Sequence, residues 1–354
     1  MLFPLRKQIS NILTGNALGS QISFPITRDF FLDSIILEIS GTVTTAAATA
    51  GPDGILGLVQ NLTLQIADGA SNRNQTQVSG PSAIQKSFTL TGAIDQATLN
   101  AHLIGMGTGT FLIRYPLFFK NPSLSDPVGS AFLLPLPRYN TNPVLTVTFG
   151  TQAQLDQNVS PTFAISAGIS ARVIFNKRQV DNIQFPTIES EFIENVVSYS
   201  ASGAGQLYEM QVPGTYFMFG LRGYTGAAAA VAWADPTTTN GVLLMQILGN
   251  SLRQNLFRDL QFDNQMSSQD NWSATTTRSQ TNGLFNGVGI YNFLHDGFGL
   301  EVGEVGSSLN ANLLAGSGSR VQLLQDIAGS ATTRVAYFWD RVFGDLSSLK
   351  MQFR

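Results

Sequence analysis

Reactive side chains are few in this sequence of 354 residues. It contains no cysteine, and its only histidines are His102 and His295. Without cysteine the chain can form no disulfide, thiolate metal site or cysteine nucleophile, and two histidines do not suffice for a structural zinc site. The Gly-x-Ser-x-Gly turn that carries the nucleophile of α/β-hydrolases is also absent. Nucleophilic and metal-assisted catalysis therefore have little to use, and we expect no cofactor.

Charged residues are scarce as well. Asp, Glu, Lys and Arg make up 12% of the chain, about half the share in an average soluble domain. The 20 basic and 23 acidic residues give a formal net charge of −3 with no basic block, which argues against sequence-specific binding of nucleic acid. Because 43% of the residues are hydrophobic, we expect more apolar surface than one subunit can bury, and hence a permanent oligomer.

The sequence also lacks an apolar run long enough to span a bilayer. Within the first 20 residues, Arg6 and Lys7 interrupt the apolar stretch that a secretory signal would need. We therefore expect the chain to be made and folded in a cytoplasm.

Strand signals, in contrast, are abundant. Eight runs of β-branched or alternating apolar residues are bounded by Gly, Pro, Asn and Asp. They lie at residues 35–39, 62–66, 145–149, 171–175, 216–219, 242–245, 321–324 and 335–338. Helices are expected only at residues 2–13, at residues 251–266 and directly after Pro81. The pattern predicts an all-β protein of many strands, either a sandwich or a jelly roll.

The second half of the chain repeats the plan of the first. In each half a strand closes on glycine, a second strand contains Gln-Ile, and a polar insertion with a helix precedes an aromatic strand. The spacing between equivalent positions falls from 182 residues (Gly41 to Gly223) to 162 (Arg172 to Arg334), as changes in loop length would produce. We predict an N-terminal amphipathic segment at residues 1–20 and two β-domains, at residues 21–180 and 181–354.

This layout resembles the double jelly-roll major capsid proteins of membrane-containing icosahedral viruses and phages. Residues 57–62, which lead into a strand, and the Tyr115-Pro116-Leu117 sequence near a strand end are similar to the first jelly roll of that family. The resemblance covers nearly the whole chain and includes no catalytic motif. It implies two tandem eight-stranded jelly rolls, with short helices in insertions and at the N-terminus. It also implies a homotrimer whose six jelly rolls form a pseudo-hexagonal tile over an inner membrane.

We accordingly expect a structural subunit of an icosahedral virion capsid, without enzymatic activity. Its partners would be further copies of itself, minor capsid or penton proteins and the internal membrane, with assembly in the host cytoplasm. The alternatives are a two-domain β-sandwich that binds or hydrolyses glycans, and a viral spike or adhesin. A trimer that tiles into sheets would favour the shell, whereas a monomer that binds an oligosaccharide would favour the glycan alternative.

Two groupings of residues could suggest catalysis. His295 lies beside Asp296 after an aromatic strand, and a carboxylate can orient an imidazole. We favour a simpler interpretation, in which this is a loop histidine next to an exposed acid. Gly105, Gly107 and Gly109 resemble a dinucleotide-binding loop, but they precede a strand instead of a helix, so we expect a flexible loop.

Metal and membrane candidates complete the survey. An acidic strand start could bind Ca²⁺ between subunits, although solvated carboxylates are the simpler interpretation; its residues are Glu189, Glu191 and Glu194. A basic amphipathic helix at residues 2–13 could lie on anionic lipid headgroups, or could instead dock under its own β-domain. Its candidate membrane-facing residues are Phe3, Arg6, Lys7, Ile9, Ile12 and Leu13.

Overall fold

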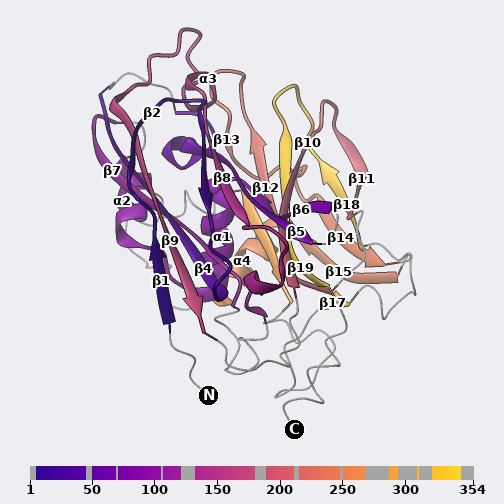
Figure 1. Ribbon diagram of the computed structural model, residues 1–354. Coiled ribbons are helices and arrows are strands. Elements are labelled where there is room, and N and C mark those ends of the chain that lie inside the picture. The colour runs from indigo at the N-terminus through magenta and orange to yellow at the C-terminus, as the bar shows by residue number, and fades with distance from the viewer. Residues whose placement is uncertain are drawn as a thin grey trace. The chain divides into compact units, whose positions relative to one another are not determined.

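The computed structural model describes residues 5–44, 50–68, 71–104, 107–120, 132–179, 189–210, 215–247, 250–267, 287–293, 309–310 and 321–343. The chain divides into two compact units, one of Met1–Ile193 with Leu346–Arg354 and one of Glu194–Asp345. Each unit consists mainly of β-strands (Figure 1). The boundary between the units falls inside one strand, β10 (Glu189–Ser198).

The first unit contains nine strands before β10. They are β1 (Leu5–Ile9), β2 (Leu13–Asn16), β3 (Gln21–Pro25), β4 (Phe31–Val43), β5 (Val59–Asp68), β6 (Ser71–Val78), β7 (Gly109–Phe118), β8 (Val144–Phe149) and β9 (Ile165–Arg178). Its α-helices are α1 (Gly80–Thr91), α2 (Gln96–Ile104) and α3 (Gln152–Leu155), and its 3₁₀ turns are η1 (Gly54–Leu58) and η3 (Leu136–Arg138).

The second unit continues from β10 with strands and one described helix. The strands are β11 (Gly203–Glu209), β12 (Thr215–Thr225), β13 (Ala232–Trp233), β14 (Val242–Ile247), β15 (Asn250–Leu256), β16 (Val288–Asn292), β17 (Leu309–Asn310), β18 (Val321–Ile327) and β19 (Arg334–Phe343). The helix is α4 (Phe257–Ser267).

Two sheets form each unit, and their strand orders are equivalent. In the first unit, one sheet runs β1-β9-β4-β7, with β2 also beside β9, and the other runs β6-β5-β8-β3. In the second unit, β10-β19-β12-β16 repeats the first order and β15-β14-β18-β11 repeats the second. Each set fills eight strand positions, so the chain has the two tandem eight-stranded jelly rolls that the sequence predicts. Within the first unit, the opening residues of β10 also pair in parallel with β6.

The helix predicted at residues 2–13 is wrong for the described part of that segment. Residues Leu5–Ile9 form β1, which pairs antiparallel with β9 from Leu5 opposite Arg178 to Ile9 opposite Ile174. β2 pairs with the same strand further along. A short isolated helix is only marginally stable in water, whereas β9 offers a row of backbone hydrogen-bond partners. The segment is thus the first strand of the first jelly roll.

The other two predicted helices have different outcomes. α1 begins at Gly80, with Pro81 in the first turn where its missing N–H costs nothing, and its C-cap Gly92 has a φ of 67°. This confirms the helix expected after Pro81. The helix expected at residues 251–266 is half wrong, because its first six residues pair with β14 as part of β15. Only α4 is helical, so the leucine spacing across both elements is coincidental.

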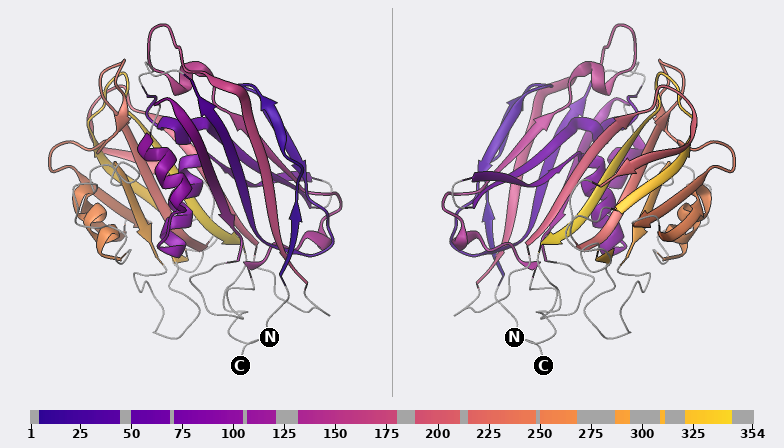
Figure 2. Two further views of the ribbon diagram at one scale, coloured as in Figure 1. Left: turned by 90° about the vertical axis from the view of Figure 1, so that its left-hand side faces the viewer. Right: turned by 90° about the vertical axis from the view of Figure 1, so that its right-hand side faces the viewer.

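All eight predicted strand runs lie in strands, and these supply the two cores. In the first unit, buried Ile, Leu, Val and Phe side chains from both sheets face one another, and α1 and α2 pack against β7 (Figure 2). In the second unit the buried residues include stacked aromatic rings. The Tyr208 and Tyr337 ring centroids lie 3.6 Å apart, and Phe219 stacks near both rings.

Candidate assembly surfaces

Exposed apolar side chains are concentrated at the edge formed by β1 and β2. Among the described residues only eight large hydrophobic side chains are exposed, and four of them fall within nine positions here: Leu5, Ile9, Ile12 and Leu13. Ile9 and Ile12 keep 56% and 59% of their surface accessible. β1 has β9 on one side and no described strand on the other. An unpaired apolar edge of this kind is usually covered by another chain.

The exposed face of β1 continues across its sheet. Gln8 lies opposite the core residue Phe175, so the side chains that alternate with Gln8, including Ile9, point outward. In register with Ile9, an apolar row crosses the outer face through three partly exposed residues: Ile174, Ile36 and Pro116. This outer row, from Ile9 to Pro116, is a continuous apolar strip on four neighbouring strands.

A charged cluster lies in the next row of the same face. Glu38 accepts hydrogen bonds from Arg114 Nε at 2.8 Å and from Arg172 Nε at 2.6 Å, and Arg114 Nη1 also donates to Asp95 at 2.6 Å. Burial alone would raise the pKa of Glu38, but the hydrogen bonds and positive charges of the two arginines outweigh it and hold that pKa below its usual value. Glu38 and Arg172 lie in two of the predicted strand runs, yet only the register shows that they meet.

One of the three predicted metal ligands, Glu194, belongs to a buried ion pair. Glu194 Oε1 accepts a hydrogen bond at 2.9 Å from Arg222, whose side chain is fully buried and also bonds the hydroxyl of Tyr224. Alternation along β10 points Glu194 to the opposite side from Glu191. The structure therefore does not bring these carboxylates together, and the side chain of Glu189 lies outside the described residues. No group of three potential metal ligands occurs among the described side chains.

Helix α4 presents a mixed surface to solvent in the second unit. Phe257 and Leu260 are buried, while Phe262 is 58% exposed and lies on the same helix face as Asp259 and Asp263. α4 follows β15 directly, and β15 ends the sheet order β11-β18-β14-β15. An exposed phenylalanine between two carboxylates thus lies next to a strand with no described partner on its outer side.

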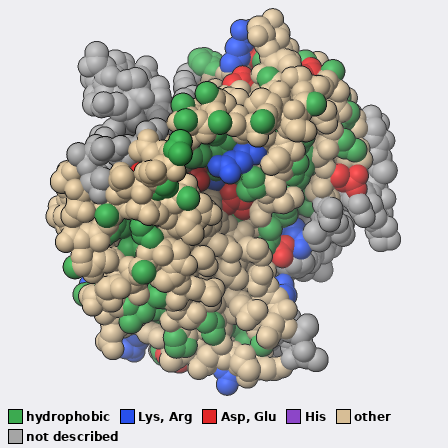
Figure 3. All heavy atoms as spheres, turned by 90° about the horizontal axis from the view of Figure 1, so that it is seen from above, with side chains coloured by type: hydrophobic (Ala, Val, Ile, Leu, Met, Phe, Trp, Pro, Cys, Tyr) green, Lys and Arg blue, Asp and Glu red, His purple; other side chains and the backbone are tan. Residues whose placement is uncertain are grey.

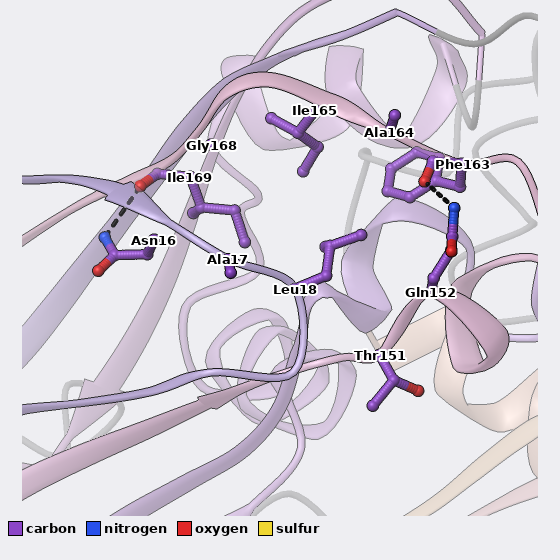
Figure 4. Close-up of a pocket in the computed structure, with 10 residues that line it drawn as sticks. All are labelled: Asn16, Ala17, Leu18, Thr151, Gln152, Phe163, Ala164, Ile165, Gly168 and Ile169. Atoms are coloured by element: carbon purple, nitrogen blue, oxygen red, sulfur yellow. Dashed lines mark hydrogen bonds between the residues drawn. The ribbon is translucent and has the colours of Figure 1, made fainter.

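A hollow of about 390 Å³ lies in the first unit between the start of β9 and the segment after β2 (Figure 4). Its wall includes Leu18, Ile165 and Ile169. The two amides at its rim already serve the backbone: Asn16 donates to Ile169 O at 2.9 Å and Gln152 to Phe163 O at 2.8 Å (Figure 4). The hollow therefore offers few unengaged polar groups to a ligand.

The remaining predicted sites give little chemistry. His295, Asp296 and Gly105 lie outside the described residues, as does Phe3, and the side chain of His102 in α2 is not described. Gly109 opens β7, so the glycine-rich segment leads into a strand as expected. None of the described helices is long and apolar enough to cross a bilayer. The face seen from above consists mostly of uncharged polar atoms and backbone (Figure 3).

Comparison with known proteins connects this architecture to one group of structures. No family model matches the sequence, and no curated protein does. Among solved structures, the chain is similar to the major capsid protein of STIV, Sulfolobus turreted icosahedral virus, with a TM-score of 0.66, 15% identity and 98% of each chain covered. The PBCV-1 virus capsid gives a TM-score of 0.56 at 11% identity, over 97% of this chain and 94% of that one.

The major capsid protein P2 from bacteriophage PM2 is similar as well. Its TM-score is 0.54 at 12% identity, over 96% of this chain and 99% of that one. These likenesses, with the strand orders above, show that the chain has the double jelly-roll fold found in these capsid proteins.

Proposed function

We propose that this chain is a major capsid protein, a structural subunit whose homotrimers tile an icosahedral shell. The observation that carries the proposal is the match to viral capsid proteins over at least 96% of this chain, in which both jelly rolls take part. Two equivalent units per chain would give a trimer six similar units around one axis, and six-fold outlines pack into hexagonal layers. Scarce surface charge would let such layers meet with little loss of ion hydration.

Two finer elements of the proposal rest on the resemblance alone. They are an internal membrane beneath the shell, and minor capsid or penton proteins at its special positions. The predicted lipid contact of residues 2–13 depended on an amphipathic helix, and β1 is a strand. Lipid analysis of purified native particles tests the membrane, and closed particles that contain no lipid would contradict it.

The proposed assembly can be tested on the purified chain. Sedimentation equilibrium should give about three times the 38.1 kDa of one chain, and electron microscopy should show hexagonal sheets or closed particles. Binding of the same preparation to an oligosaccharide array should be measured in parallel. A monomer at all concentrations that binds oligosaccharides would contradict the proposal and favour the glycan-binding alternative.

A further inference from the structure

The chain itself contains one example of a strand that is added to the end of a sheet. Within the first unit, β10 pairs in parallel with β6 through Phe192 opposite Thr76. The helix that follows β6 takes part, because Lys86 of α1 lies 4.4 Å from the centre of the Phe192 ring. A first strand of a jelly roll thus docks on the strand before a helical insertion, and the helix contacts its side chains.

The chain has a second strand equivalent to the docking strand and a second strand and helix equivalent to the receiving pair. β1 occupies in the first jelly roll the place that β10 occupies in the second, and β15 with α4 occupies the place of β6 with α1. β1 and β15 are both end strands among the described strands. Ile9 on β1 and Phe262 on α4 stay more than half exposed in the chain. Among the described residues, one copy therefore has a docking strand and a receiving strand, and each ends its sheet.

The charges that lie beside the two exposed apolar side chains are of opposite sign. β1 exposes Arg6 and Lys7 beside its apolar residues, and α4 exposes Asp259 and Asp263 beside Phe262, with Arg258 of the same helix 3.7 Å from Asp259. Apolar contact with complementary charge at the rim favours protein association and fixes its register. A lipid surface would match the basic strand but would leave the acidic helix without a partner.

We propose that β1 of one copy adds in parallel to β15 of the next, with its side chains packed on the exposed face of α4. The partner is a second copy of this chain, so the inference rests on the self-assembly proposed above and names its contact. Each copy gives one surface and receives the other, which makes the interface heterologous. Such head-to-tail contacts close into a ring when the rotation between copies allows it.

Charge reversal tests the contact, since both residues are exposed and their replacement should not disturb folding. Lys7→Glu and Asp263→Lys should each raise the dissociation constant of the oligomer about tenfold or more. The double variant, which restores opposite charges, should recover most of the wild-type affinity. Val159→Asp is the matched control, because Val159 is fully exposed and lies outside both surfaces; it should leave assembly unchanged.

The outcomes separate this contact from the proposed function. Single variants that assemble like the wild type, or a double variant that shows no recovery, would overturn the β1–α4 contact while leaving a capsid role in place. A wild-type chain that stays monomeric would instead count against the capsid role itself. Variants that keep the oligomer but lose binding to anionic phospholipid vesicles would assign β1 to a membrane and overturn the contact.

Discussion

The two jelly rolls share a strand order but not a core chemistry. In the first, the largest share of the buried side chains is aliphatic, with Ile, Leu and Val in both sheets. In the second, tyrosine is added to the aliphatic residues: six of the eight tyrosines are buried there. The Tyr199 and Tyr337 hydroxyls bond to each other at 2.7 Å, and Gln325 donates to both.

This difference distinguishes the sequence pattern that specifies the fold from the side chains that fill the core. Alternation of apolar and polar positions decides which face of a strand is buried, whatever apolar side chain is used. Hydroxyl groups in a core must find hydrogen-bond partners, since an unsatisfied buried group costs about 1–3 kcal/mol. The second core should therefore respond more strongly than the first to changes in charge and polarity, and four predictions test this.

Alkaline pH should produce the largest difference in stability between the two jelly rolls. Burial raises the pKa of four described tyrosines in the second jelly roll above the ordinary value of 10.0, and that of Tyr115 in the first; the four are Tyr199, Tyr208, Tyr291 and Tyr337. A raised folded-state pKa gives stability that is complete below pH 10 and is lost as the pH rises further. Fluorescence of Trp233 and Trp339, both in the second unit, should therefore show earlier unfolding in urea at about pH 11 than at about pH 8.

Two matched variants sharpen this first prediction. The Tyr291 hydroxyl is buried with no hydrogen-bond partner among the described residues, so Tyr291→Phe should flatten the alkaline loss without lowering stability at neutral pH. Tyr115→Phe removes a 3.1 Å hydrogen bond to Leu56 O and should cost about 1 kcal/mol at neutral pH. Burial raises the pKa of Tyr115 as well, so Tyr115→Phe should also flatten the alkaline loss. An alkaline loss in Tyr291→Phe that equals that of the wild type would contradict the role given to Tyr291.

Among single substitutions of polar groups, Glu194→Gln should lower the free energy of unfolding most. Arg222 is fully buried and Glu194 is its ion-pair partner at 2.9 Å, so the change removes a carboxylate that compensates a buried positive charge. Losing one member of a buried pair costs about 3–5 kcal/mol. Urea unfolding followed by tryptophan fluorescence measures the loss, and a change below about 1 kcal/mol would refute a structural role for the pair.

Gly220→Ala should lower the free energy of unfolding less than Glu194→Gln does, because it strains the core without removing a charge. A Cβ at Gly220 would overlap the Phe338 ring, which lies directly opposite in the register. Overpacking of this kind costs about 1–3 kcal/mol. Gly41→Ala in the first jelly roll is the comparison. Its Cβ would meet Ile165 Cγ2 at 2.9 Å and the ring of Phe111, which lies directly opposite, at 3.0 Å. Both approaches are looser than the one at Gly220, so this change should be tolerated better. Thermal melting of both variants measures the difference, and the reverse order would contradict it.

Sequence patterns found the central strands and missed several of the end strands. β4, β5, β8 and β9 have neighbours on both sides and bury alternating apolar residues, so their signal is strong. β3, β11 and β15 are end strands with mixed, polar sequences such as Gly203–Glu209, and they were not predicted. Their conformation comes from backbone pairing with a neighbour, which leaves no period in the side chains.

The candidate surface was predictable in content but not in form. Ile9, Ile12 and Leu13 were candidate membrane-facing residues beside basic ones, and the structure exposes them. The helix assigned to them was wrong, since residues spaced for a helix can equally line an edge strand when a neighbour supplies hydrogen bonds. The Glu38 cluster required the register of three strands, which residues 76 and 134 positions apart in sequence do not disclose.

Glu38→Gln in the first jelly roll should have the smallest effect, although it also removes a carboxylate from two arginines. Arg114 and Arg172 are 35% and 40% exposed, so water screens the charges that remain, and the expected cost at neutral pH is about 1 kcal/mol. Because the pKa of Glu38 is lowered from 4.5, its contribution is present above that pH and disappears as the pH falls through the folded-state pKa. The variant should therefore lose less stability than the wild type between about pH 5 and pH 3, measured by hydrogen exchange of β4 peptides. If Glu38→Gln matched the cost of Glu194→Gln, exposure of the arginines would not be what distinguishes the two pairs, and the contrast between the two units would fail at its charged groups.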